Sequence, residues 1–470
     1  MSIIRMKYPF LDEIAKYAKE HLPEEACGLI AGSEDENGRL ITKVYYLTNT
    51  DHAEDHFTMD PKEQLAAIKD MRANGLKPLG NWHSHPSSPS RPSDEDIKLA
   101  YDPNASYMIM SLMAENPVIN SGQCAKACPY NAIAHLKRPC KFSCPVDAIT
   151  YNEYGLSVIN KDKCIRCGKC IHSCPFGAIG TKSFMVPVIE AIKSGKHVYA
   201  MAAPATEGQF GPDITMDSWA EAMKQVGFED FYDVGLGGDM TAAYEAEEWT
   251  EAYKEGKKKV TSCCPAFVNM VRLHFPQLAD CVSATVSPMC GVSRLIKAQD
   301  PEAVTVFIGP CVAKKSEVVD QQIKGNADYV LTYSEIRAIM RAKNVELKPC
   351  ENQNQIASTF GKRFANAGGV TAAVLQSMKE ANADVDVKVH KANGAAECKK
   401  ALLLMRAAKL PADFIEGMAC EGGCVGGPSA YNDQFSSKKS RDSLISQADD
   451  RGIHENLSHY QMDSFSMHRE

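Results

Sequence analysis

Residues 164–175 read CIRCGKCIHSCP, which is the spacing Cys-x2-Cys-x2-Cys-x3-Cys-Pro. The end of this run, C-x3-C-P-x2-A-I, occurs three times, at 124–133, 140–149 and 170–179. Three near-copies in so short a stretch are not a chance pattern. Because this stretch lacks the apolar periodicity of conventional helices, we expect cysteine ligation to take the place of a hydrophobic core here.

The four-cysteine run resembles the bacterial ferredoxin motif, in which three cysteines hold one 4Fe–4S cluster and the fourth holds another. A zinc ribbon is the alternative, and the x2-x2-x3 spacing followed by proline favours iron and sulfur. The resemblance implies one cluster on Cys164, Cys167, Cys170 and Cys128. A second cluster would take Cys174 and Cys124, with Cys140 and Cys144 as substitutes. These substitutes are needed because the first run is broken, so one intact and one labile cluster is the other possibility.

Composition sets the frame for the rest of the chain. Its 470 residues suggest roughly three domains. With 44% hydrophobic and 24% charged residues it is ordinary globular sequence, and a net charge of -7 argues against a nucleic-acid partner. The sequence has no apolar run long enough for a membrane span and no signal-peptide core, which predicts a cytoplasmic protein. In such a reducing compartment, 18 cysteines indicate metals or catalysis rather than disulfides.

Residues 83–96, on the amino-terminal side, contain the pattern H-x-H-x7-S-x2-D, formed by His83, His85, Ser93 and Asp96. Histidines two apart on a strand point to the same side, and a carboxylate from the next helix can complete three ligands. Zinc accepts such a set and keeps a fourth position for water. Glu25, in PEEACGLIAG, is the candidate for managing the proton of that water. Two surface histidines in a Ser/Pro loop are the alternative.

These residues, with P-x-E-x-C-G upstream, resemble the JAB1/MPN (JAMM) metallopeptidases over residues 1–119. The resemblance implies an α/β domain that binds zinc through His83, His85 and Asp96. It also implies that Glu25 is the general acid/base and that Ser93 helps to stabilise the oxyanion. Small bacterial members act at the carboxyl end of ubiquitin-like sulfur-carrier proteins, which is therefore the expected substrate class.

Helix-like and strand-like segments alternate from about residue 181, which predicts parallel sheets covered by helices. Three cysteine segments follow apolar strands here: TSCCP at 261–265, GPC at 309–311 and MACEGGC at 418–424. Loops at strand ends of α/β sheets are where ligands converge, so these thiols could hold a cubane cluster. Taken singly, each could be a buried apolar thiol. The last 35 or so residues are polar and weakly periodic, and we expect a surface arm.

Together these segments resemble the iron-only (FeFe) hydrogenases over residues 122–470. The resemblance implies that the cubane of an H-cluster is held by Cys264, Cys311, Cys420 and Cys424, the last of which bridges to the diiron subsite. It implies that Lys314 contacts one cyanide ligand, Pro204 and Ala205 face another, and Met418 packs on the diiron unit. The implied proton relay comprises Cys263, Glu317, Ser283 and Glu245.

Some residues depart from the hydrogenase pattern. Gly309 stands where methionine is usual, Phe267 where tryptophan is frequent, and Glu421 where proline is common. All four implied ligands, Lys314, Met418 and the relay thiol Cys263 are retained. Because sensory members often lose that thiol, its presence favours turnover.

The sequence therefore predicts a multidomain α/β protein with three parts: a JAB1/MPN domain at 1–119, a ferredoxin-like domain at 120–181 and a two-lobed hydrogenase domain at 182–470. The leading hypothesis is the reaction 2 H+ + 2 e- ⇌ H2, with ferredoxin or a similar carrier as partner. One alternative is a JAMM zinc isopeptidase with a passive hydrogenase portion, and another is a non-catalytic iron–sulfur sensor or assembly protein. The first two parts both look trimmed at 118–122, as a gene fusion, a deletion or an assembly artefact would leave them.

Overall fold

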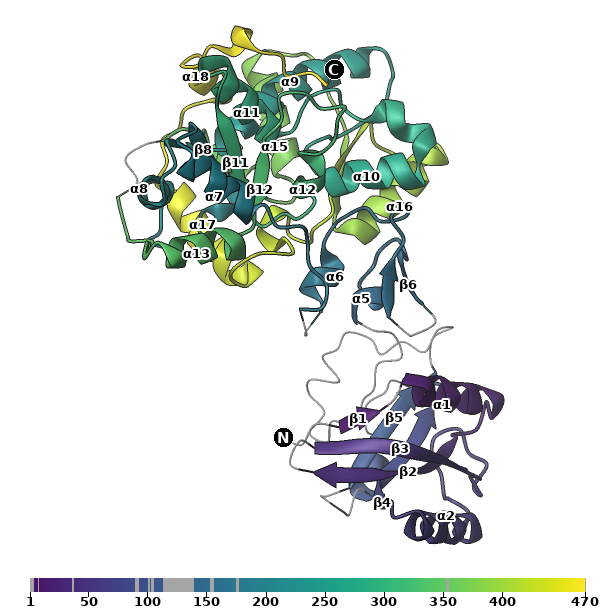
Figure 1. The fold of residues 1–470 in the computed structure, drawn as a ribbon. Coiled ribbons are helices and arrows are strands. Elements are labelled where there is room, and N and C mark those ends of the chain that lie inside the picture. The colour runs from purple at the N-terminus through teal and green to yellow at the C-terminus, as the bar shows by residue number, and fades with distance from the viewer. Residues whose placement is uncertain are drawn as a thin grey trace. The chain divides into compact units, whose positions relative to one another are not determined.

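The computed structural model describes residues 4–6, 8–35, 38–88, 93–99, 102, 105–112, 139–152, 156–174, 177–351 and 355–469. The junction at 118–122 and the candidate ligands Cys124 and Cys128 lie outside these residues. The chain divides into two compact units, Met1–Phe142 and Ser143–Glu470, which are described one at a time (Figure 1). Among the described residues, no helix has the length and apolar character needed to cross a bilayer.

The first unit is built on one five-stranded sheet in the order β1-β3-β2-β4-β5. Its strands are β1 (Ile4–Met6), β2 (Cys27–Asp35), β3 (Gly38–Leu47), β4 (Lys77–His85) and β5 (Ser106–Ser111). Helix α1 (Tyr8–Glu20) contributes Ile14 and Ala18 to one buried cluster, whereas α2 (Pro61–Ala73) contributes Ala67 and Met71 to another. The short helix α3 (Asp94–Leu99) lies between β4 and β5 in the chain.

The second unit contains two parallel sheets, as the alternating pattern predicted. One has the order β12-β11-β8-β9, and the other the order β10-β14-β13. The first sheet comprises β8 (Val198–Ala202), β9 (Asp230–Asp233), β11 (Val304–Ile308) and β12 (Tyr329–Leu331). The second comprises β10 (Lys259–Val260), β13 (Val389–Asn393) and β14 (Phe414–Met418). Because β10, β11 and β14 each run directly into a cysteine segment, the carboxyl ends of both sheets carry the candidate ligands.

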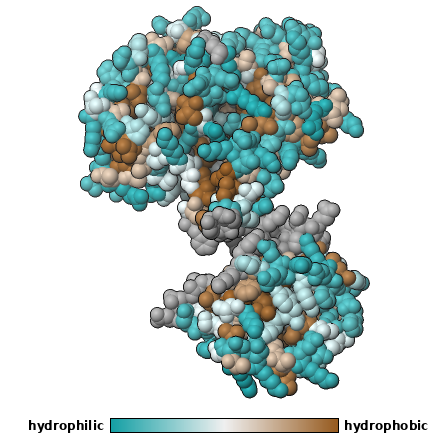
Figure 2. All heavy atoms as spheres, turned by 45° about the vertical axis from the view of Figure 1, so that its right-hand side comes forward, coloured by the Kyte–Doolittle hydropathy of each residue, from teal (hydrophilic) through white to brown (hydrophobic). Residues whose placement is uncertain are grey.

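Helices cover these sheets. They are α7 (Met185–Lys193), α8 (Met216–Val226), α9 (Gly235–Lys254), α10 (Pro265–His274), α11 (Pro288–Gln299), α12 (Lys314–Glu317), α13 (Tyr333–Ala342), α14 (Thr359–Arg363), α15 (Gly369–Glu380), α16 (Ala395–Arg406), α17 (Gln434–Ile445) and α18 (Ile453–Leu457). The long helix α9 is buried along most of its length, with Trp249 fully enclosed. Figure 2 shows that the visible surface is mostly hydrophilic, with apolar residues in scattered places.

The iron–sulfur segment has little regular structure, as expected where ligation replaces a core. It contains a two-stranded antiparallel sheet of β6 (Ile149–Tyr151) and β7 (Ser157–Ile159), and the short helix α6 (Lys169–His172). A further single turn, α5 (Pro139–Phe142), precedes it in the chain. Val146, Ala148 and Ile165 pack in one cluster with residues of α10, so this segment rests on the larger domain.

The prediction of a surface arm over the last 35 or so residues is wrong. Helices α17 and α18 form there, and Arg441, Leu444, Ile453 and Met467 are buried. The periodicity is weak because polar groups share the buried face: Arg441 and Asn456 point inward and find polar partners there. A hydrophobic pattern alone does not register such residues.

Candidate active sites

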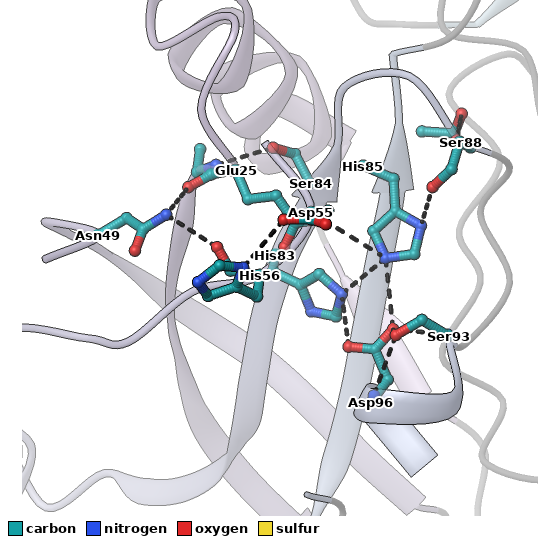
Figure 3. A network of polar contacts seen from close by, with 12 residues as sticks. Glu25, Asn49, Asp55, His56, His83, Ser84, His85, Ser88, Ser93 and Asp96 are labelled. Carbon is teal, nitrogen blue, oxygen red and sulfur yellow. Dashed lines mark hydrogen bonds and ion pairs between the residues drawn. The ribbon is translucent and has the colours of Figure 1, made fainter. Parts of the chain in front are cut away.

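The first site lies at the carboxyl end of β4, where His83 and His85 face each other (Figure 3). Their Nε2 atoms are 3.0 Å apart. Asp96, from α3, places Oδ1 at 3.1 Å from Nε2 of His83 and Oδ2 at 3.4 Å from Nε2 of His85. Ser93 precedes that helix and donates its hydroxyl to Asp96 Oδ2 at 2.7 Å, which fixes the carboxylate.

This donor set fits a metal ion. The ligand atoms of His83, His85 and Asp96 all lie within 4.8 Å of one another, and both histidines are buried. Two imidazole nitrogens and a carboxylate converging on one point make a typical zinc site with room for a fourth ligand. Ser88 lies 2.9 Å from Nδ1 of His85 and so orients that ring with Nε2 toward the shared point.

Glu25 borders the same point from the segment before β2. Its Oε1 lies 3.8 Å from Nε2 of His85, and the residue is only 3% exposed. Its backbone is fixed by Asn49, which donates to the Glu25 carbonyl at 3.1 Å. Burial raises the pKa of Glu25 to about 7, with Asp96 adding to the effect. A carboxyl group with that pKa can take up and return a proton near neutrality.

The second site is a cavity in the iron–sulfur segment, lined by Cys144, Cys164, Cys167 and Cys170. Four thiols on one cavity fit a 4Fe–4S cluster. Cys144 is the fourth described thiol on this cavity, whereas Cys128, which the sequence interpretation assigned to this cluster, lies outside the described residues. Ala148 N donates to Cys144 Sγ at 3.2 Å and Ala178 N donates to Cys174 Sγ at 3.3 Å, so the two described C-P-x2-A-I copies share this turn hydrogen bond.

The third site is a cavity at the ends of β10, β11 and β14. Its lining includes all the residues that the sequence singled out as ligands or neighbours of the diiron unit: Pro204, Ala205, Cys263, Cys264, Cys311, Lys314, Met418, Cys420 and Cys424. The four implied cubane ligands thus converge from three loops that are far apart in the sequence.

Burial and mutual proximity raise the pKa of three of these four thiols. Burial raises the pKa of Cys311 to about 11 and that of Cys424 to about 12, and the neighbouring cysteines add to both shifts. The pKa of Cys420 is raised well above its usual value for the same reasons. Four crowded thiols in a mostly apolar cavity favour a cationic group that can neutralise them as thiolates, and iron is such a group.

Comparison with known proteins matches separate parts of the chain to different families. Residues 196–428 match the family "Iron only hydrogenase large subunit, C-terminal domain", and residues 8–124 match "Prokaryotic homologs of the JAB domain". The periplasmic [Fe] hydrogenase large subunit of Nitratidesulfovibrio vulgaris is 30% identical over 52% of this chain and 72% of that protein. The CysO-cysteine peptidase of Mycobacterium tuberculosis is 30% identical over 23% of this chain and 73% of that protein. The chain belongs to both families.

The resemblances to the JAB1/MPN metallopeptidases and to the iron-only hydrogenases are thereby confirmed. A third family, "LdpA Fe-S cluster-binding domain", matches residues 134–185. This match supports the binding of iron–sulfur clusters by the segment between the JAB domain and the hydrogenase domain. Iron hydrogenase 1 of Clostridium pasteurianum is 28% identical over 53% of this chain and 53% of that protein. The chain thus spans about half the length of that relative.

Lys314 in the hydrogenase domain is held by a compact polar cluster. Its Nζ donates to Glu317 Oε2 at 2.6 Å and to Ser287 Oγ at 2.8 Å, and Ser287 Oγ donates to Glu317 Oε1 at 2.5 Å. Glu317 therefore forms a buried ion pair with Lys314, whereas Ser283 and Glu245 lie in a separate group. The carboxylate keeps the pKa of the buried Lys314 raised despite desolvation, which opposes it.

A second polar group leads from the hydrogenase cavity toward the surface. Glu245 is fully buried on α9, and its Oε1 accepts from Ser262 N at 3.4 Å, next to Cys263. Ser283 interacts with Glu245 and donates to Glu248 Oε2 at 2.6 Å. Glu248, half-buried and paired with Lys259 at 2.8 Å, was missed by the sequence analysis. Its position one helical turn after Glu245 was the available signal.

The iron–sulfur cavity and the hydrogenase cavity meet at one loop. Cys167 lines both cavities. The next residue, Gly168, adopts φ +78°, and a Cβ there would lie 2.2 Å from Val312 Cγ2 and 2.8 Å from Pro428 Cγ. Lys169 then pairs with Glu421 at 3.0 Å, and Glu421 is the residue that replaces the family's usual proline. Only glycine allows the two cysteine loops to approach this closely.

Proposed function

We propose that the chain is an iron-only hydrogenase that interconverts protons, electrons and dihydrogen. The observation that carries this proposal is the convergence of Cys264, Cys311, Cys420 and Cys424 on one cavity that Lys314 and Met418 also line. An H-cluster bound by these sulfurs would supply the metal centre for the chemistry of dihydrogen. The protein would supply the binding site, a proton path and an electron path.

The proton path follows from the polar groups beside the cavity. The Cys263 thiol lines the cavity and would exchange its proton with the carboxyl group of Glu245. Because burial raises the pKa of Glu245 to about 8, this carboxyl can carry a proton at neutral pH. From there Ser283 and Glu248 lead toward the solvent. Glu317 contributes differently, by orienting Lys314.

Electrons would enter through the cluster held by Cys144, Cys164, Cys167 and Cys170, because Cys167 also borders the hydrogenase cavity. A ferredoxin or similar one-electron carrier is the partner that suits such a cluster. The test is hydrogen evolution from a reduced carrier after anaerobic maturation, with Cys311→Ser as the inactive control. Intact iron–sulfur clusters without hydrogen evolution by the unmodified chain would favour the sensor or assembly alternative.

A second activity is favoured by the site on β4: a zinc-dependent peptidase acting on ubiquitin-like sulfur-carrier proteins. His83, His85 and Asp96 would hold the zinc, which would polarise a water molecule and the scissile carbonyl. Glu25 would take the proton from that water and return it to the leaving amine. Ser93, beside Asp96, would donate to the developing oxyanion.

Glu25→Gln tests the peptidase proposal. We expect it to reduce cleavage of a sulfur-carrier fusion by about 10²- to 10⁴-fold, because the proton acceptor is lost. Zinc content should stay the same, since Glu25 is not one of the three proposed ligands. Glu24→Gln is the matched control, because Glu24 is the adjacent carboxylate and pairs with His52 at 3.0 Å on the surface. Equal cleavage by the Glu25→Gln variant and the unmodified chain would refute the assignment.

Glu245→Gln tests the buried carboxyl group through stability. The pKa of Glu245 is raised in the folded state by burial, so folding binds a proton between the unfolded value, 4.5, and about 8. The unmodified chain should therefore lose stability relative to Glu245→Gln as pH rises through this window, by up to about 1.4 kcal/mol per pH unit, with no further change above it. Unfolding curves from pH 5 to 9 measure this. Glu247→Gln, on the exposed side of α9, should show no such trend.

A further inference from the structure

Helix α17 brings a buried cation to the wall of the hydrogenase cavity. The helix lies beyond residues 196–428, where the family match ends. Its first turn is capped by Asp433, which accepts from Phe435 N and Ser436 N. Arg441, in the third turn, is only 1% exposed. A guanidinium is rarely buried to this extent without a specific set of partners.

The three donor groups of Arg441 reach two separate parts of the chain. Nε donates to the Pro204 carbonyl at 3.2 Å, Nη1 donates to Asn366 Oδ1 at 2.5 Å, and Nη2 donates to the Lys362 carbonyl. Pro204 itself lines the cavity. One planar side chain therefore joins the loop after β8 to the segment that follows α14.

The Asn366 segment leads directly to a proposed ligand. Its neighbour Ala365 lines the cavity, and the Ala365 carbonyl accepts from Cys424 N at 2.8 Å. Asn366 also forms a β-bridge with Gly423. Through these contacts Arg441 connects the Pro204–Ala205 wall with the loop that presents Cys424.

Charge and packing show that this arrangement is built into the fold. Arg441 belongs to a buried group of two cations and two anions, in which Lys362 pairs with Glu207 at 2.8 Å and Asp233 interacts with both cations. Gly208 has no room for a Cβ, which would lie 2.6 Å from Arg441 N and 2.7 Å from Ser437 O. Helix α17 is thus seated on the loop that contains the cavity wall. Buried ion groups add little net stability, so a role in specifying geometry is the better explanation.

We propose that Arg441 is a positioning residue of the hydrogenase site, which holds the Pro204–Ala205 wall and the Cys424 loop in one fixed relation. This inference rests on the proposed function, because it assigns the wall to the environment of the bound cluster. Its effect is on the geometry and electrostatics around that cluster. The residue itself does not face the reacting atoms.

Two variants test the role of Arg441, so that the test does not depend on the folding of a single variant. Arg441→Lys keeps the charge but loses the planar fork, which lysine cannot replace. The double variant Arg441→Met, Glu207→Gln removes one cation and one anion together and so leaves no unbalanced charge. Lys439→Gln is the matched control, because Lys439 lies on the same helix and is exposed.

The readouts are the infrared bands of the CO and CN ligands after anaerobic maturation and the midpoint potential of the site. We expect shifted or split bands and a shifted potential in both variants, and the spectrum of the unmodified chain for Lys439→Gln. A folded Arg441→Lys protein with unchanged bands and potential would overturn the proposal. Failure of both variants to fold would also count against it, because the residue would then be merely structural.

Failure of the proposed function is recognised separately. If the unmodified chain shows no CO or CN bands, the hydrogenase assignment fails. The electron paramagnetic resonance spectrum of a cubane on Cys264, Cys311, Cys420 and Cys424 then serves as the readout in the unmatured protein. A changed spectrum in the two Arg441 variants would still support positioning of the Cys424 loop, and an unchanged one would contradict it.

Discussion

Replacement of Cys263 by serine should reduce hydrogen evolution by about 10²- to 10⁴-fold, the range over which a positioned proton donor contributes. Cys263 lines the hydrogenase cavity, is 8% exposed and neighbours the buried carboxyl group of Glu245. A serine hydroxyl is a far weaker acid than a thiol, so it cannot pass protons at the same rate. The measurement is hydrogen evolution from reduced dye by the anaerobically matured variant.

Iron content distinguishes this effect from loss of the cluster. Cys263 is not one of the four proposed ligands, so the variant should bind as much iron as the unmodified chain. Cys398→Ser is the control, because Cys398 is a fully buried thiol on α16 whose Sγ lies 3.7 Å from the Ala392 carbonyl that it contacts. Turnover by Cys263→Ser within twofold of the control would remove this thiol from the proton path.

Gly168→Ala should impair the delivery of electrons to the hydrogenase site. The added Cβ has no space, because it would lie 2.2 Å from Val312 Cγ2 and 2.8 Å from Pro428 Cγ, so the loop that carries Cys167 and these neighbours must move apart. A displacement of about 1 Å at a catalytic junction can cost up to about 10²-fold in rate. We therefore expect hydrogen evolution driven by a reduced ferredoxin to fall by about 10- to 100-fold.

Gly177→Ala supplies a matched control for this experiment. Gly177 lies in the same segment and also has a positive φ, +62°, but a Cβ there meets nothing within 4 Å. It therefore imposes the backbone strain of the substitution without the clash. Equal rates for the two variants would show that close approach of the loops is not needed for electron transfer.

The sequence predicted those parts of the architecture that depend on a short motif or a regular pattern. Alternating helix and strand patterns predicted the parallel sheets, and three short cysteine segments predicted the lining of one cavity, which the structure brings together. The spacing of His83, His85 and Asp96 likewise predicted a convergent donor set. In each case a few residue types at fixed intervals suffice, because metal ligation restricts both the chemistry and the spacing.

Features that depend on tertiary packing were not predicted. The sequence interpretation assigned Cys144 to a second cluster, whereas the structure places it on one cavity with Cys164, Cys167 and Cys170. The charges of Glu248 and Arg441 are typical of a solvated helix face, and only the neighbouring segments show that they turn inward. A charged residue is buried because of partners distant in sequence, which no local pattern reveals.

The most direct test of the account is the infrared spectrum of the purified full-length chain after anaerobic maturation. If Cys264, Cys311, Cys420 and Cys424 anchor an H-cluster, the spectrum should contain the CO and CN stretching bands of the diiron subsite, and Cys311→Ser should abolish them. A chain that carries its full complement of cubane iron yet shows none of these bands would contradict the assignment of this cavity to hydrogen chemistry.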